Sequence, residues 1–332
     1  MKRLADKSFI KIVASLLSLV LVTGSVAACG SKSESTSSSG VKILYINTDN
    51  NDTFRQKLSD AIETSGKNKG ASVTVVESGD SVENQVSLVS DAKSQGYDAI
   101  ILRLADSGTA LQMNTASNGL PIIYVNNEPS EEHLDSNANI FVGSQETVAG
   151  QYQAEYVMDK LGTKSMNIII FEGEQGHSGT IGRTKGVRNT LLNSGVDANI
   201  VFMDYANWSD TEAANKFGIF MKTGQSVDAV FCNNDTMALG AVQAMKDYGL
   251  DYTSIPVCGV DAVEDACNSI MAGEMAFTVL QDAEAQGSKA VEAAIILSGG
   301  GTIDDIDGAS EDGKYIWVPF VPVDKSNADD YL

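Results

Sequence analysis

From residue 41 onward, short runs rich in branched apolar residues alternate with longer amphipathic segments, and this alternation constrains the fold more than any other feature. The first run, "VKILYIN" (41–47), is followed by "FRQKLSDAIETSGKNKG" (54–70). Further apolar runs follow at 72–77, 98–103, 121–126 and 139–144. Such intervals suit strands joined by crossover helices. The pattern predicts a parallel sheet covered by helices on both faces.

The same pattern begins again after residue 144. Its apolar runs lie at 166–171, 199–204, 228–233, 255–260 and 276–281. Two such halves predict two doubly wound α/β lobes, although no sequence repeat relates them. Ligands of open α/β sheets bind outside the carboxyl ends of the strands, and pockets favour domain interfaces. We therefore expect the ligand site in the cleft between the lobes.

The amino-terminal segment has the features of an export signal. Residues 1–28 combine a basic start with an apolar stretch that is short for a membrane span. The stretch ends in "VAAC" (26–29), which resembles the bacterial lipobox and predicts a lipid on Cys29. The alternative is an ordinary signal peptide followed by a chance cysteine. The Ser-rich segment 29–40 is expected to be a flexible tether.

Charge and cysteine content exclude several classes of protein. Without residues 1–28, which carry four positive charges and one negative charge, the formal net charge changes from −21 to −24. No basic cluster remains, so nucleic acid is not expected as a partner. The other cysteines have no CxxC spacing, so we expect buried packing residues rather than a disulfide framework or a zinc site. These cysteines are Cys232, Cys258 and Cys267.

The turn "GEQGHSGTIGRTKG" (173–186) follows a predicted strand, so it must be tested as a phosphate-binding loop. It contains neither GxGxxG nor GK[ST]. It does contain His177 and Arg183, and polar side chains follow other predicted strands as well. Such groups offer donors and acceptors that suit the hydroxyl groups of a sugar. The polar candidates are Asp52, Asn126, His177, Arg183, Asn234, Asp261 and Gln281.

Two aromatic residues complete the candidate site. Phe54 and Trp208 each lie just past a predicted strand, and their rings could cover the two apolar faces of a pyranose. Taken singly, the candidates have simpler explanations: Asp52 could cap a helix, Asn126 and Asn234 could satisfy turns, and Phe54 could be core. Together they are typical of a site for a monosaccharide that lies flat between two rings.

At this point the chain resembles the periplasmic galactose/glucose-binding proteins, which deliver sugars to ABC importers. The resemblance extends from about residue 41 to 327. It is strongest in "NNEPSEEHLDS" (126–136), "GEQGH" (173–177), "NNDTMALGAVQAM" (233–245), "SIPVCGVDA" (254–262), "TVLQDAEAQ" (278–286) and "VPFVPVDKSN" (318–327).

The resemblance implies a periplasmic-binding-protein type I fold with two Rossmann-like lobes joined by a three-segment hinge. One lobe would hold 41–145 plus 283–316, and the other 146–282 plus 317–332. It further implies that Phe54 and Trp208 stack on the sugar while the polar candidates bond to its hydroxyls.

The chain departs from the family pattern at two site positions and in one loop. Gly179 replaces a carboxylate, and Gln281 replaces an asparagine. We expect either that Gly179 leaves room for a substituent such as a glycoside, or that Thr180 or water takes over the contact. The family's calcium loop would lie at "DKLGTKSMN" (159–167), which is short and carries two lysines, so neither calcium nor any other cofactor is expected.

The sequence thus predicts a binding protein that captures D-galactose or D-glucose by lobe closure and passes it to a permease. Alternatives are a different sugar or a galactoside, and a sensor that contacts a chemoreceptor or a histidine kinase. A glycoside hydrolase using Asp52 and Asp261 is disfavoured, because no catalytic signature is present. The lipidated chain would sit on the outer face of a single cytoplasmic membrane, or in the periplasm of a two-membrane cell.

Overall fold

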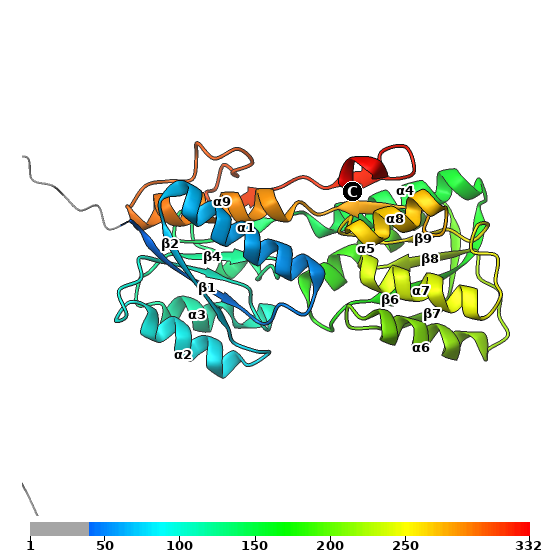
Figure 1. Ribbon diagram of the computed structural model, residues 1–332, viewed down its shortest axis with the longest axis horizontal. Coiled ribbons are helices and arrows are strands. Elements are labelled where there is room, and N and C mark those ends of the chain that lie inside the picture. The colour runs from blue at the N-terminus through cyan, green and yellow to red at the C-terminus, as the bar shows by residue number, and fades with distance from the viewer. Residues whose placement is uncertain (1–39) are drawn as a thin grey trace, which may run out of the picture. The chain divides into compact units, whose positions relative to one another are not determined.

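A computed structural model describes residues 40–332, which form one compact unit organised by two parallel sheets (Figure 1). The first sheet has the strand order β11–β5–β4–β3–β1–β2. Its strands are β1 (Lys42–Asn47), β2 (Ser72–Glu77), β3 (Ala99–Leu102), β4 (Ile122–Val125), β5 (Asn139–Gly143) and β11 (Tyr315–Trp317). Helices α1 (Thr53–Lys69) and α9 (Ala283–Ser298) pack on one face, and α2 (Val82–Ala92) and α3 (Ala110–Ala116) on the other.

Strand β1 shows why this sheet is buried on both faces. Ile43 and Tyr45 belong to the core beneath α1 and α9, whereas Leu44 and Ile46 belong to the core beneath α2 and α3. Successive side chains of a strand point to opposite faces, so a continuous apolar run serves both cores. The predicted parallel sheet covered by helices on both faces is confirmed.

The second sheet has the order β7–β6–β8–β9. Its strands are β6 (Ser165–Glu172), β7 (Asp197–Tyr205), β8 (Ala229–Cys232) and β9 (Val257–Cys258). Parallel bridges lead from it to β10 (Thr278–Leu280), which pairs antiparallel with β12 (Val321–Val323). Helices α4 (Glu146–Leu161) and α5 (Ser178–Asn193) share one core, and α6 (Asp210–Met221), α7 (Asp235–Asp247) and α8 (Glu264–Ala272) share the other.

Both sheets follow one topology. Across the first lobe the strand order is β2–β1–β3–β4–β5–β11, and across the second it is β7–β6–β8–β9–β10–β12. In both lobes the second strand along the chain lies at one edge, next to the first, and the other four follow in chain order on the other side of the first. This is a doubly wound arrangement, with the switch point between β1 and β3 in one lobe and between β6 and β8 in the other. The two-lobed fold predicted from the sequence is therefore confirmed.

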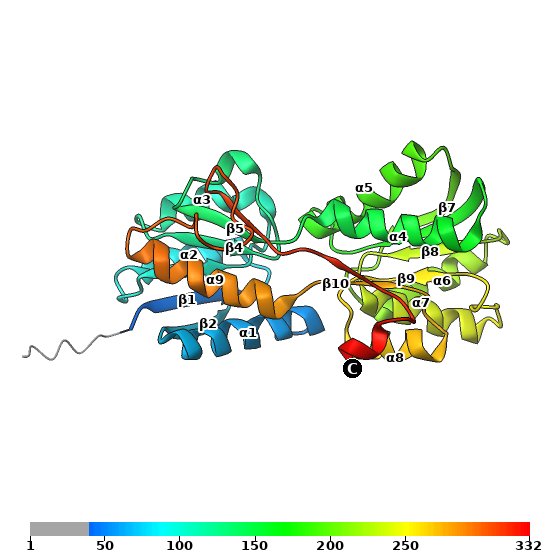
Figure 2. The same cartoon turned by 90° about the horizontal axis from the view of Figure 1, so that it is seen from above.

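The chain passes between the two sheets three times (Figure 2). The passages lie between β5 and α4, between β10 and α9, and between β11 and β12. Trp317 and Val318, which we had assigned to the second lobe, remain with the first: Trp317 pairs with Gly143, and the N–H of Val318 donates to the Gly143 carbonyl at 2.8 Å. The boundary between the lobes lies later than predicted because the parallel pairing of β11 with β5 continues through Trp317.

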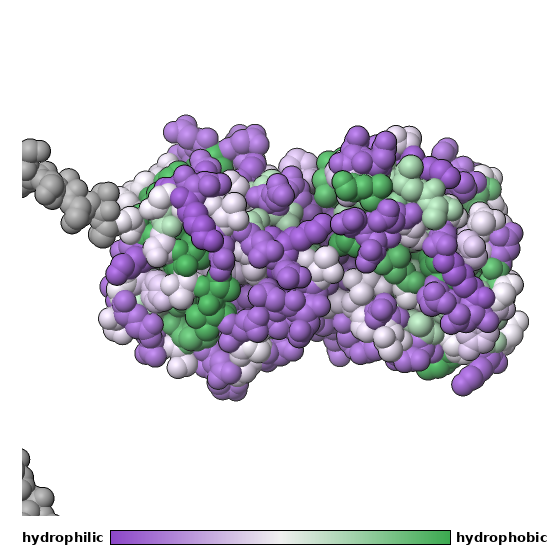
Figure 3. Space-filling model, in the orientation of Figure 1, coloured by the Kyte–Doolittle hydropathy of each residue, from purple (hydrophilic) through white to green (hydrophobic). Residues whose placement is uncertain are grey.

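Short 3₁₀ helices complete the described chain at Ser107–Thr109, Glu131–His133 and Ala328–Tyr331. The three cysteines expected to be packing residues are indeed buried free thiols. No helix within residues 40–332 is long and apolar enough to cross a membrane. The predicted signal, Cys29 and nearly all of the tether lie outside the described residues. Hydrophilic residues cover most of the face shown in Figure 3.

Candidate ligand-binding site

One small cavity, about 20 Å³ in volume and partly open to solvent, is lined by side chains from both lobes. The first lobe contributes Asp52, Phe54 and Asn126. The second contributes His177, Arg183, Trp208, Asn234, Asp261 and Gln281. The structure therefore brings all nine residues selected from the sequence to one place, together with Arg55 and Arg103.

The strained backbone of the described chain is concentrated at this cavity. Asn126 and Trp208 each have a φ of 63°, and Asp261 has a φ of 121°. Residues other than glycine rarely adopt such conformations, and they persist where the surrounding structure enforces them, commonly at functional sites. Three of the eleven lining residues thus carry a conformational cost.

Three cavity residues also cap helices. An oxygen of Asp52 accepts the N–H of Arg55 at 3.0 Å, and Asn234 Oδ1 accepts the N–H of Met237 at 2.9 Å. His177 Nδ1 accepts the N–H of Gly179 at 3.0 Å. The simpler explanation of Asp52 as a helix cap is therefore correct for one of its oxygens, and Asn234, whose simpler explanation was a turn, also caps a helix. The same helix starts hold these side chains at the cavity.

His177 presents a hydrogen-bond donor to the cavity. Burial lowers the pKa of His177 well below its usual value, and Arg103, Arg183 and Arg55 lower it further. The ring is therefore neutral near pH 7. Because Nδ1 is an acceptor in the cap, the remaining proton is assigned to Nε2.

Arg183 is held in place by neighbours on several sides. Its Nε donates to Glu146 Oε2 at 2.7 Å, and its Nη1 donates to the Asn233 carbonyl at 2.6 Å. Its Nη2 donates to Gln281 Oε1 at 2.7 Å. Burial lowers the pKa of Arg183, but Glu146 and Asp261 outweigh that effect and raise it above its usual value. The guanidinium is a fixed cation in the floor of the cavity.

Two cavity-lining groups of the second lobe, Gln281 Nε2 and the Asp261 carboxylate, lack a close hydrogen-bond partner among the described residues. Gln281 Nε2 is buried and has no partner among the described residues. The Asp261 carboxylate lies 3.8 Å from Arg183 Nη1. Burial raises the pKa of Asp261 well above its usual value; Arg183 opposes this shift, and Asp235, Asp52 and Glu146 add to it. Buried polar groups are normally hydrogen-bonded, so both are candidates to bind a ligand.

The glycine-rich turn serves packing and geometry rather than phosphate. A Cβ on Gly173 would lie 2.1 Å from the Trp208 ring, so only glycine lets that ring approach. Gly176 has a φ of 84°, as a tight turn requires. Two side chains lie close to Gly179: a Cβ there would lie 3.2 Å from His177 Nδ1 and 3.6 Å from Glu146 Oε1. Room for a ligand substituent beside Gly179 stays a prediction.

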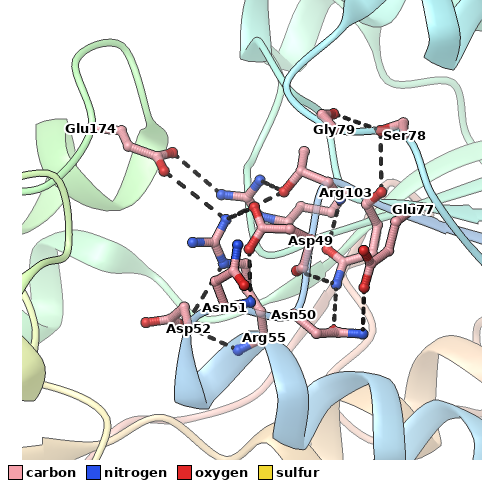
Figure 4. Close-up of polar contacts among 12 residues, drawn as sticks. Asp49, Asn50, Asn51, Asp52, Arg55, Glu77, Ser78, Gly79, Arg103 and Glu174 are labelled. Atoms are coloured by element: carbon pink, nitrogen blue, oxygen red, sulfur yellow. Dashed lines mark hydrogen bonds and ion pairs between the residues drawn. The ribbon is translucent and has the colours of Figure 1, made fainter.

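Arg55 and Arg103 were missed by the sequence analysis. Arg103 Nε donates to Asn126 Oδ1 at 2.8 Å, and Arg55 Nη1 donates to Asp49 Oδ2 at 3.0 Å. Figure 4 shows the side chains of Arg55 and Arg103 near Asp49. Arg103 directly follows the apolar residues of β3, and a charge in that position was a usable signal. Arg55 lies inside a helix, where the sequence pattern shows nothing unusual.

Several polar contacts join the two lobes across the cavity mouth. Glu174 reaches from the second lobe toward both arginines, 3.5 Å from Arg103 Nη2 and 4.0 Å from Arg55 Nη1 (Figure 4). The Ser178 hydroxyl accepts the N–H of Glu128 at 2.8 Å, and the Ser178 N–H donates to Asn127 Oδ1 at 3.1 Å. These bonds form only when the lobes are close together.

Comparison with known proteins identifies the broader family. The family model for the periplasmic binding protein domain matches residues 43–302. A candidate rhizopine-binding protein of Rhizobium meliloti is 31% identical over 83% of this chain and 87% of its own length. The D-galactose/methyl-galactoside-binding periplasmic protein of Haemophilus influenzae is 28% identical over 72% of this chain and 76% of its own length.

Solved structures show the same fold. An ABC transporter solute-binding protein from Bacillus halodurans, with bound myo-inositol, superposes with a TM-score of 0.78. It is 28% identical, and the match covers 89% of this chain and 99% of that one.

Two doubly wound lobes with a polar and aromatic cavity between them define the class of extracytoplasmic solute-binding proteins. This chain belongs to the periplasmic binding protein domain family and is a solute-binding protein of the sugar ABC-transporter type. Proteins of this family bind solutes and carry out no catalysis. The comparisons support this broad family and do not single out its galactose/glucose-binding branch.

Proposed function

We propose that the cavity between the lobes captures a monosaccharide, D-galactose or D-glucose in the first instance. The observation that carries this proposal is the lining of one cavity by all nine residues predicted to bind a sugar. Phe54 and Trp208 would cover the two faces of the ring. The polar groups would bond to its hydroxyls, with Gln281 Nε2 and His177 Nε2 as donors and Asp261 as an acceptor.

Ligand capture would favour the closed form, because only then do both lobes contact the same molecule. The first lobe supplies Asp52 and Asn126, and the second supplies His177 and Asp261. The closed form would then dock on the permease of an ABC importer. A sensor role, through a chemoreceptor or histidine kinase, would use the same closed form.

A cyclic polyol such as myo-inositol is the second candidate ligand. It is favoured by the similarity to the myo-inositol-bound protein of Bacillus halodurans over nearly the whole described chain. A cyclitol also presents a flat ring rimmed with hydroxyls, so the same aromatic and polar groups would suit it. A methyl-galactoside is a further candidate, although two side chains lie close to Gly179.

The soluble part of the chain, starting after Cys29, allows a direct test. It contains two tryptophans, Trp208 in the cavity and Trp317 stacked on Tyr315. Titration with D-galactose, D-glucose, myo-inositol, D-ribose and methyl-galactosides should give a saturable fluorescence change, preserved in Trp317→Phe. Absence of binding to every member of this panel would overturn the proposal.

We further propose that Cys29 carries a lipid that holds the chain at the outer face of the membrane. The lipobox-like "VAAC" sequence supports this. Labelling of the full chain with radioactive palmitate should therefore be lost in Cys29→Ser. Equal labelling of both proteins would refute the lipid anchor and leave the binding proposal unaffected.

A further inference from the structure

Glu146 is a buried carboxylate just outside the cavity. It is the first residue of α4 and is 5% exposed. Its two oxygens lie 2.7 Å from Arg183 Nε and 3.4 Å from Arg183 Nη2. Close packing of α4 on α5 makes this contact possible, since a Cβ on Gly182 would lie 2.4 Å from the Cβ of Glu146. Glycine at that position lets the carboxylate approach the guanidinium.

The helix of Arg183 supplies no carboxylate one turn before this residue. Side chains four residues apart on a helix are neighbours, so position 179 could supply a carboxylate to Arg183. The chain has Gly179 there. A Cβ on Gly179 would lie 3.6 Å from Glu146 Oε1, so the Glu146 carboxylate lies where that local partner would be.

Arg183 in turn decides which end of the Gln281 amide faces the ligand. A guanidinium can only donate, so Gln281 must direct its oxygen to Arg183, and the observed Nη2 to Oε1 distance is 2.7 Å. Nε2 is then left as the buried, unpaired donor of a cavity-lining side chain. If Arg183 moved, the amide could turn and present its oxygen instead.

Loss of the Glu146 charge would release Arg183 toward a cavity carboxylate. Nη1 lies 3.8 Å from Asp261, which is the other buried carboxylate in range. A buried cation that loses its partner is costly, so Arg183 would move closer to Asp261. That movement would occupy Asp261 and free the Gln281 amide, which changes two groups that face the ligand.

We propose that Glu146 is a positioning residue that sets the ligand selectivity of the cavity, acting through Arg183 on Gln281 and Asp261. The inference rests on the proposed function, because it needs a ligand in the cavity. It requires the ligand to offer an acceptor to Gln281 Nε2 and donors to Asp261. Glu146 itself touches no ligand in this account.

The first test compares Glu146→Gln with Glu155→Gln by calorimetric titration with D-galactose, D-glucose and myo-inositol. Glu155 lies on the same helix, is exposed, and bonds to Gln151. We expect Glu146→Gln to weaken binding by roughly tenfold or more and to change the ratio of affinities among the ligands. Affinities within twofold of Glu155→Gln for all three ligands would overturn the inference.

A double-mutant cycle separates positioning from general destabilisation. If Glu146 acts on the ligand largely through Gln281, then Glu146→Gln should weaken binding little further once Gln281→Leu is present. If the losses of binding free energy from Glu146→Gln and Gln281→Leu add fully, Glu146 does not act through Gln281. The double variant Glu146→Ala, Gly179→Asp tests the geometry: it restores a carboxylate beside Arg183 and should recover affinity relative to Glu146→Ala. A uniform loss across ligands, without recovery, would assign Glu146 a merely structural role.

The two proposals fail differently. If the unmodified chain binds no member of the ligand panel described above, D-ribose and methyl-galactosides included, the proposed function falls and this inference falls with it. If the unmodified chain binds and the Glu146 variants behave like Glu155→Gln, only the inference falls. Thermal melting of each variant shows whether it is folded, and the isosteric Glu146→Gln keeps the test available if Glu146→Ala does not fold.

Discussion

Replacement of Glu174 by glutamine should weaken ligand binding by destabilising the closed form. Glu174 faces two guanidinium groups of the other lobe, at 3.5 Å from Arg103 and 4.0 Å from Arg55. A pair of charges at about 4 Å is worth about 1 kcal/mol in water and about 4 kcal/mol near a protein surface. The Glu174 side chain is 34% exposed, so the lower value applies to each contact.

The two contacts together then stabilise closure by about 1–2 kcal/mol, which corresponds to a loss of affinity of about 5- to 30-fold in Glu174→Gln. Affinity should fall rather than rise, because Arg103 is 2% exposed and has Arg55 beside it. Removal of the Glu174 charge leaves these two neighbouring cations less compensated. The effect should shrink as salt is raised, because the pair lies at the cavity mouth.

Calorimetric titration at low and high salt measures this loss, and small-angle X-ray scattering of the ligand-free protein reports any shift toward an open form. Glu172→Gln is the matched control. It makes the same charge change two residues earlier, at the end of β6, and Glu172 forms no ion pair within the described part of the chain. Equal affinities for the Glu174 and Glu172 variants at low salt would refute the reasoning that the contacts of Glu174 with Arg103 and Arg55 stabilise the closed form.

Three further outcomes follow from the structure. Trp208→Ala should weaken binding about tenfold or more, because the ring lines the cavity, and calorimetric titration against Trp317→Phe would show it. Burial, Glu146 and Glu131 raise the pKa of Glu128 to about 7. At pH 8 the carboxyl is ionised in both the folded and the unfolded state, so its raised pKa in the folded state costs stability, and Glu128→Gln should stabilise the fold by up to about 3 kcal/mol. Near pH 4.5 the folded carboxyl is protonated and the unfolded one is half protonated, so the same substitution should have little effect. Melting curves at both pH values test this, with the exposed Glu132→Gln as control; equal shifts at both pH values would contradict it. Ellman's reagent should label no thiol of the folded soluble chain and all three after unfolding, because the remaining cysteines are buried, and fast labelling of the native protein would contradict that packing.

Much of the fold was accessible from the sequence because its signals are local. Apolar runs of six or seven residues marked ten of the twelve described strands, all but β11 and β12, and the doubly wound topology follows from their alternation with helices. The nine site residues were accessible for a related reason. The carboxyl ends of parallel strands meet at one edge of a sheet, so polar residues that follow separate strands converge.

The sequence by itself thus determined the two-lobed α/β fold and the cavity residues that follow its strands. Only the tertiary structure decided how those residues are oriented and paired. Glu146 meets Arg183 from another helix, and Arg103 meets Glu174 from another lobe. Nothing local marks such pairs, because each depends on the packing angle of helices and on the separation of the lobes. The approach of Glu146 to Gly179 has the same origin, since Glu146 belongs to a different helix.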